Sequence, residues 1–209
     1  MEATAVTAFW GVSLVFALTP GADWAYVITT GGRDRRGVAP AVAGLLTGHL
    51  LAIASVVVGV ATVITSSPLA MTLLTLAGSC YLVWLGIAAL RRPAEPPRTP
   101  QPPSFGPGRG FATGVGVSLL NPKVFLLLLA LLPQFASPTA PWSLGQQMAT
   151  LGLIHLANCA VVYVAVGVGA AAALTTRPRA ARAVAVASGV VMIGLGLTLI
   201  VEQVVAHVG

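Results

Sequence analysis

Long apolar stretches alternate with short polar gaps along the whole chain. A helix needs roughly 20 apolar residues to cross the hydrocarbon core of a bilayer. Six stretches approach or exceed that length, near residues 4–30, 38–64, 69–90, 109–134, 145–174 and 183–206. The pattern therefore predicts an all-α polytopic membrane protein with six transmembrane helices.

Composition agrees with this fold class and limits the partners. Of the 209 residues 56% are hydrophobic and 8% are charged, and the mean hydropathy is +0.91. A soluble domain carries roughly 25% charged residues. The net charge of +6 could suggest nucleic acid, but the arginines are split among three short gaps and form no continuous stripe. The lipid bilayer is therefore the expected environment, and no nucleic-acid partner is expected.

The arginines lie in alternate gaps. The gaps at 31–37, 91–108 and 175–182, with Arg109 at the edge of the second, hold all of them: Arg33, Arg35, Arg36, Arg91, Arg92, Arg98, Arg109, Arg177, Arg179 and Arg182. The gaps at 65–68 and 135–144 hold no charge. Because cytoplasmic loops of membrane proteins are enriched in Lys and Arg, this distribution places the three basic gaps in the cytoplasm and both termini outside.

The two halves of this single transmembrane domain resemble each other. Repeat one would cover 1–90 and repeat two 109–209, joined by a cytoplasmic linker at 91–108. Leu18-Thr19-Pro20 matches Leu120-Asn121-Pro122, and a histidine lies in the second stretch of each half. Because three helices per half is an odd number, the second half must be inverted. Inverted repeats with interrupted helices point to a transporter site near the bilayer midplane.

Each half also carries one charge inside an apolar stretch, just after a proline. Asp23 follows Pro20, and Lys123, the only lysine of the chain, follows Pro122. A charge at mid-bilayer costs at least ~2.5–3.5 kcal/mol, so such residues are rare and usually functional. Each proline removes a helical hydrogen bond and should break the first or the fourth helix.

The breaks therefore predict a substrate-binding or coupling site, which would include Thr19, Gly21 and Asn121 with the two charges. Two structural alternatives stay open: the prolines are packing kinks, or the charges form a salt bridge that only neutralises them. His49 and His155 occupy matched places in the two halves, where they either pack or line a cavity and handle protons. Asn158 and Tyr163 are weaker candidates.

Small residues are interpreted as packing elements. Gly44-x-x-x-Gly48 and Gly110-x-x-x-Gly114 have the spacing of close helix contacts. Cys80 and Cys159 lie in apolar stretches, where small buried hydrophobes are expected.

Several segments resemble the LysE/RhtB family of amino-acid exporters over nearly the whole chain. These are Thr19-Pro20-Gly21-Ala22-Asp23, Asn121-Pro122-Lys123 with the downstream Leu132-Pro133-Gln134-Phe135, and the segment from Gly78 to Gly86. The family usually has a second proline before the aspartate, where this chain has Ala22. The resemblance implies export of amino acids and related compounds from the bacterial cytoplasm, and hence a place in the bacterial inner membrane.

We therefore expect a secondary transporter, not an enzyme, that exports amino acids or small amphoteric metabolites, driven by protons or the membrane potential. No Gly-x-x-x-x-Gly-Lys-Ser/Thr phosphate loop is present, and no cofactor or metal is expected. A heavy-metal or other ion exporter is the main alternative, but the histidines are scattered along the sequence. A thiol–disulfide carrier and a membrane enzyme or scaffold are further alternatives. A homo-oligomer is compatible with the sequence.

Overall fold

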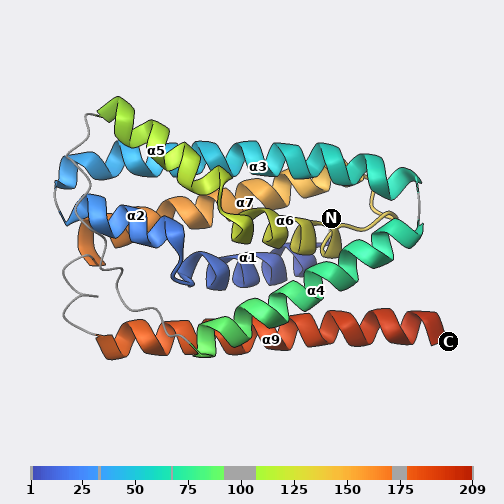
Figure 1. The fold of residues 1–209 in the computed structure, drawn as a ribbon. Helices are drawn as coiled ribbons and strands as arrows, with labels where there is room; N and C mark the ends of the chain where they lie inside the picture. The colour runs from blue at the N-terminus through green and yellow to red at the C-terminus, as the bar shows by residue number, and fades with distance from the viewer. Residues whose placement is uncertain (1, 33, 67, 92–106, 171–177, 209) are drawn as a thin grey trace.

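The computed structural model describes residues 2–32, 34–66, 68–91, 107–170 and 178–208, and every regular element in these ranges is helical (Figure 1). This confirms the all-α prediction. Most of the predicted linker at 91–108, the end of the fifth apolar stretch, and Arg33, Arg92, Arg98 and Arg177 lie outside the described residues.

The helices follow the apolar stretches closely. Their bounds are α1 (Ala3–Leu18), α2 (Ala22–Gly31), the 3-10 turn η1 (Arg35–Gly37), α3 (Val38–Ser66), α4 (Pro68–Arg91), α5 (Pro107–Leu119), α6 (Pro122–Gln134), α7 (Leu144–Ala165), the π-helical turn η2 (Val166–Ala170) and α9 (Pro178–Val208). The predicted interruptions are both present, because the first stretch is divided into α1 and α2 and the fourth into α5 and α6.

The residue before each proline explains where the helices end. Thr19 has φ −73° and ψ 117°, and Asn121 has φ −83° and ψ 102°, so both are extended. Proline disfavours helical geometry in the residue that precedes it. At each break the axes of the flanking helices bend by 58°. The Asn121 side chain accepts a hydrogen bond from the Lys123 amide at 3.1 Å, an N-cap that starts α6.

Consecutive helices run back and forth through one bundle (Figure 1). The chain passes along α1 and α2, returns along α3, and runs back along α4. It then repeats this course along α5 and α6, α7 with η2, and α9. The two marked chain ends lie at the same end of the bundle, and α4 packs along α9 on one side. Helix α3 lies between α5 and α7, and α1 packs on α7.

Two apolar clusters lie on either side of the helix breaks. One contains Phe9 and Phe16 of α1 together with Leu128 and Leu131 of α6 and residues of α3 and α7. The other surrounds Trp24 with residues of α3 and α7. Both broken helices are thus held against the unbroken α3 and α7, so the breaks meet inside the bundle.

Glycines permit the closest contact between α3 and α5. A Cβ atom on Gly44 would overlap the Phe111 carbonyl and lie 3.1 Å from the Cα of Gly114. A Cβ on Gly114 would lie 2.6 Å from the Ala41 carbonyl oxygen. These contacts agree with the packing interpretation of the glycine motifs. Gly110 is an exception, since the nearest atom to its added Cβ is the Tyr26 hydroxyl at 3.8 Å.

Two helical segments in the described ranges are long and apolar enough to cross a membrane, Arg35–Val60 and Leu144–Gly169. The bent pairs α1–α2 and α5–α6 each meet the same test as single spans, which raises the number to four. Shorter apolar segments lie in α4, at Leu76–Ala88, and in α9, at Gly189–Val205.

The contact between α3 and α5 leads to a stability prediction. Gly44→Ala should lower the thermal unfolding temperature of the purified protein, because overpacking costs about 1–3 kcal/mol. Gly59→Ala in the same helix is the matched control, since nothing lies within 4 Å of the added atom. It should be neutral or stabilising by up to ~1 kcal/mol, the helix-propensity gain of Ala over Gly. Equal unfolding temperatures for the two variants would contradict the packing interpretation.

Candidate functional site

The two helix breaks face each other across the repeats. The Lys123 ammonium donates a hydrogen bond to the Thr19 backbone carbonyl at 3.1 Å. The Asn121 amide donates to Asp23 Oδ1 at 3.4 Å. Because the break at Pro20 ends α1, the carbonyl groups of its last turn lack helical donors. Lys123 supplies one donor, and the Trp24 indole supplies another to Ala17 at 2.8 Å. Lys123 therefore lies at the partially negative end of α1.

Asp23 is buried in the first turn of α2. This position places its carboxylate at the partially positive end of the helix. Its Oδ2 atom accepts a hydrogen bond from the Tyr163 hydroxyl at 2.8 Å and lies 3.7 Å from His49 Nε2. The carboxylate is thus held by side chains from α3, the second break and α7.

Asp23 and Lys123 do not form a direct salt bridge. Among the residues that the structure describes, the His49 imidazole lies within 4.0 Å of the Asp23 carboxylate, a contact that is an ion pair only when His49 is protonated, and no such contact joins Asp23 to Lys123. Each charge instead has neutral or weakly charged partners of its own. The structural alternative, in which the two charges only neutralise each other by direct contact, has no support in this geometry.

The two histidines are bound crosswise to the broken helices. His49 of α3 contacts the Ser118 hydroxyl of α5 through Nδ1 at 2.8 Å, and His155 of α7 contacts the Ser13 hydroxyl of α1 through Nδ1 at 2.9 Å. The two imidazole rings lie 5.7 Å apart between their centroids. Each histidine is therefore oriented by the broken helix of the opposite half.

A cavity lies between the breaks and the histidines. Its volume is about 20 Å³, which is enough for about one water molecule. Both polar and apolar side chains line it: Phe16, Ala17, Thr19, Gly21, Asp23, Trp24, His49, Asn121, Lys123, Val124, Leu127, His155 and Tyr163. The predicted site residues other than the two prolines thus surround one small space. Their binding or coupling roles remain predictions.

For several residues the contacts or the burial differ from the sequence-based predictions. Tyr163, a weak candidate, makes the shortest hydrogen bond to Asp23. Ser13 and Ser118 were not singled out, since serine is common in helices and no spacing marks it. Asn158 donates to Ser13 Oγ at 3.0 Å. Cys80 was expected to be buried, and this was wrong because the side chain is exposed on α4.

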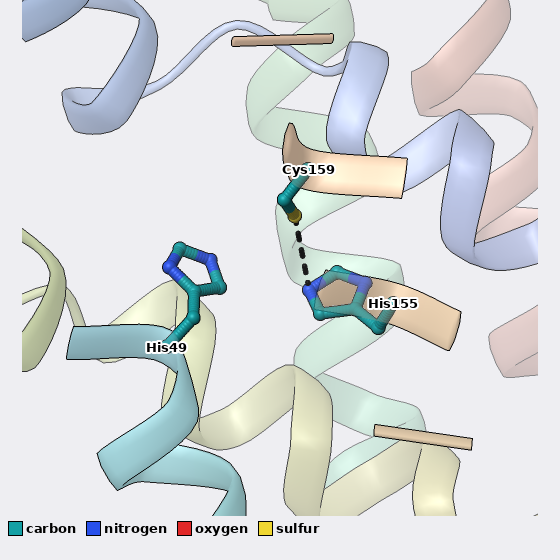
Figure 2. Close-up of side chains that lie close together, drawn as sticks. All are labelled: His49, His155 and Cys159. Carbon is teal, nitrogen blue, oxygen red and sulfur yellow. Dashed lines mark hydrogen bonds between the residues drawn. The ribbon is translucent and has the colours of Figure 1, made fainter. Parts of the chain in front are cut away.

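Cys159 is buried, as expected, but it has polar neighbours. Its sulfur lies 3.5 Å from His155 Nε2, one helical turn away on α7 (Figure 2). Ligand atoms of His49, His155 and Cys159 all lie within 4.8 Å of one another. Histidines that are far apart in the sequence are thus gathered with a thiol in one cluster, which the expectation of no metal site did not anticipate.

Comparisons with known proteins identify the family to which the chain is similar. Residues 14–203 match the family described as LysE type translocator. The chain is 36% identical over 130 residues to the homoserine/homoserine lactone efflux protein of Salmonella typhi, covering 62% of this chain and 63% of that protein. It is 33% identical over 152 residues to an uncharacterized membrane protein of Vibrio cholerae, covering 72% and 73% of the two chains.

A threonine efflux protein of Escherichia coli is 27% identical over 142 residues, covering 64% of this chain and 69% of that protein. No solved structure matches the chain. These relatives are named as efflux proteins or membrane proteins. The family match extends over both helix breaks, both histidines and Tyr163, and so this membrane protein belongs to the LysE type translocator family.

Proposed function

We propose that this protein is a secondary transporter that exports small amino acids from the bacterial cytoplasm across the inner membrane. The observation that carries the proposal is the separate placement of Asp23 and Lys123 on one cavity, each held by partners other than the opposite charge. An amino acid presents a carboxylate and an ammonium group, which complement a lysine and an aspartate. Charge-assisted hydrogen bonds of this kind are among the stronger ones.

The relatives narrow the class of substrate. One group is named for homoserine and homoserine lactone efflux and another for threonine efflux. Homoserine and threonine are small amino acids that carry a hydroxyl group on a short side chain. The hydroxyl, amide and imidazole groups around the cavity could hydrogen-bond such an oxygen. We therefore propose short polar amino acids as the preferred substrates, ahead of long or doubly charged ones.

We further propose six membrane spans arranged as two inverted repeats. Helices α4 and α9 have 24 and 31 residues, and ~20 residues suffice for a span. In these repeats α1 corresponds to α5, α3 to α7 and α4 to α9. Two pairs of corresponding helices pack on each other, α3 on α7 and α4 on α9. The contact of α3 with α5 also has a counterpart in the contact of α7 with α1. This is the contact pattern that a two-fold relation between the halves would produce.

The arginines support an orientation with both termini outside. In the described ranges, Arg35 and Arg36 precede α3, Arg91 ends α4, Arg109 starts α5, and Arg182 lies near the start of α9. The starts of α3, α5 and α9 lie at one end of the bundle, opposite to the chain ends, and α4 runs back toward it (Figure 1). By the positive-inside rule that end faces the cytoplasm.

The energy for export would come from the membrane potential or from protons. One elementary charge that crosses the membrane gains ~2.3 kcal/mol per 100 mV. A proton that enters while the substrate leaves would use this energy. The cavity offers His49, His155 and Asp23 as proton-accepting groups, which supports a proton-coupled cycle.

Substrate export provides the first test. Proteoliposomes loaded with labelled homoserine, threonine, lysine or glutamate should release the first two faster than the last two. With substrate at equal concentration on both sides and an imposed membrane potential and pH gradient, net release should stop when ionophores collapse the two together. Empty liposomes and Lys123→Ala protein serve as controls. Equal release of all four compounds, or release that ionophores do not affect, would count against the proposal.

Charge variants test the roles of Lys123 and Asp23. Lys123→Ala should lower export at least about tenfold, because a charged hydrogen bond contributes about 1.5–3 kcal/mol and 1.4 kcal/mol is a factor of ten. Lys123→Arg should also be poor, since a planar guanidinium does not replace a compact ammonium. The double variant Asp23→Asn with Lys123→Met should keep its membrane abundance and remain inactive. Robust export by the double variant would reduce both charges to structural roles.

Topology can be tested with single cysteines in a background of Cys80→Ser and Cys159→Ser. Thr139→Cys lies on the exposed loop between α6 and α7, and Gly108→Cys lies in the exposed first turn of α5. A membrane-impermeant thiol reagent should label position 139 in intact cells and label position 108 only after the cells are permeabilised. The opposite labelling pattern would invert the proposed orientation.

A further inference from the structure

The cluster of His49, His155 and Cys159 has the geometry of a cation site. His155 and Cys159 are separated by four residues on α7, so they lie on the same face of the helix, with His155 Nε2 and Cys159 Sγ 3.5 Å apart. His49 reaches the pair from α3, and one ligand atom from each residue lies within 4.8 Å of the others (Figure 2). All three side chains are buried.

The second ring nitrogen of each histidine is already engaged. His49 Nδ1 lies 3.0 Å from the Leu45 carbonyl oxygen, which can only accept a hydrogen bond. A proton on Nδ1 satisfies this carbonyl, with the Ser118 hydroxyl at 2.8 Å as a second partner, and the neutral ring then presents a lone pair at Nε2. His155 Nδ1 contacts the Ser13 hydroxyl at 2.9 Å, which can donate or accept a hydrogen bond. Metal-binding histidines characteristically have their outer nitrogen fixed by such a partner.

With the proton on Nδ1, the surroundings of His49 Nε2 favour a positive charge. This atom lies 3.7 Å from Asp23 Oδ2, which is beyond hydrogen-bond range. A neutral ring would place a lone pair opposite a carboxylate oxygen in a buried space. Either a second proton on His49 or a cation near both atoms would remove that repulsion. A dication with the Cys159 thiolate and the Asp23 carboxylate would give a neutral cluster, which burial favours over a net charge.

We propose that His49, His155 and Cys159 form a three-ligand site for a borderline or soft divalent cation, with Zn²⁺ as the reference ion and the Asp23 carboxylate beside His49 as a counter-charge. Two imidazoles and a thiolate are ligands that zinc accepts, and a water molecule can take the fourth tetrahedral position. Binding converts the thiol to the thiolate and releases its proton. The ligand atoms must move somewhat closer to one another, since bonds to zinc are about 2.0–2.3 Å long.

Occupancy of this site would inhibit export. Asp23, His49 and His155 all line the cavity, so a bound cation would attract the carboxylate that the substrate ammonium needs. It would also cross-link α3 and α7. The site itself depends only on the geometry, whereas inhibition rests on the proposed transport function.

Cobalt binding to the purified, tag-free protein tests the site directly. Co²⁺ should bind with one equivalent per chain and give a thiolate-to-cobalt charge-transfer band, which Zn²⁺ should abolish by displacement. Cys159→Ser should lose the band, and His155→Gln should weaken binding at least about tenfold, the loss found even for outer-shell changes. Cys80→Ser and His207→Gln are the matched controls and should retain both the band and the affinity.

Two outcomes would overturn the site. One is the absence of a charge-transfer band in the folded wild-type protein, as expected if a proton alone satisfies His49 and Asp23. The other is a band that survives Cys159→Ser and disappears in Cys80→Ser. Thermal unfolding of each variant checks the fold. If Cys159→Ser does not fold, Ser13→Ala should still weaken Co²⁺ binding about tenfold through the loss of orientation of His155.

A separate assay tests inhibition. Zn²⁺ should reduce amino-acid release from wild-type proteoliposomes by a larger fraction than from Cys159→Ser proteoliposomes, each compared with its own metal-free rate. Equal fractional inhibition would refute control through this site. A wild-type protein that binds Co²⁺ with the thiolate band but releases no amino acid would instead count against the proposed transport function.

Discussion

The structure depends on satisfying the polar groups that two prolines leave without helical partners. Thr19 and Asn121 are extended because each precedes a proline, and the helices on either side cannot complete their backbone hydrogen bonds. Unpaired backbone groups at membrane depth cost several kcal/mol each. The Lys123 ammonium and the Trp24 indole bond to carbonyl groups in the terminal segment of α1. The Lys123 ammonium, a candidate substrate-binding group, thus also stabilises the fold at the break.

The need of buried polar groups for hydrogen-bond partners also links the two halves of the chain. His49 obtains its hydroxyl partner from α5 and His155 from α1, while Tyr163 of α7 reaches Asp23 of α2. Neither half contains all the partners for its own polar residues. In the proposed transport cycle, movement of one half against the other would exchange hydrogen bonds at the centre of the molecule, which would couple the exposure of the cavity to the hydrogen bonds of these side chains.

Much of this could be predicted from the sequence, because the relevant signals were local. Hydrophobic stretches located the helices, the prolines located the breaks, and isolated charges at Asp23 and Lys123 marked the site. What could not be predicted depended on how the helices are rotated about their axes. Serine is common on any helix face, so Ser13 and Ser118 gave no signal. The exposure of Cys80 and the polar neighbours of Cys159 depend on the same helix rotations. The sequence of a membrane helix that is apolar on all sides gives little indication of which side faces the core.

The small cavity has a consequence for the strength of substrate binding. A volume of about 20 Å³ does not admit an amino acid, and Lys123 is already bonded to the Thr19 carbonyl. A substrate carboxylate that binds this ammonium must replace the hydrogen bond to Thr19 and open the space around it. The net free energy of binding is then the difference between the new hydrogen bond and the one that is lost, which are similar in strength. If the protein exports amino acids as proposed, its affinity for them should therefore be low, and the export rate should rise mainly when the cytoplasmic amino-acid concentration is high.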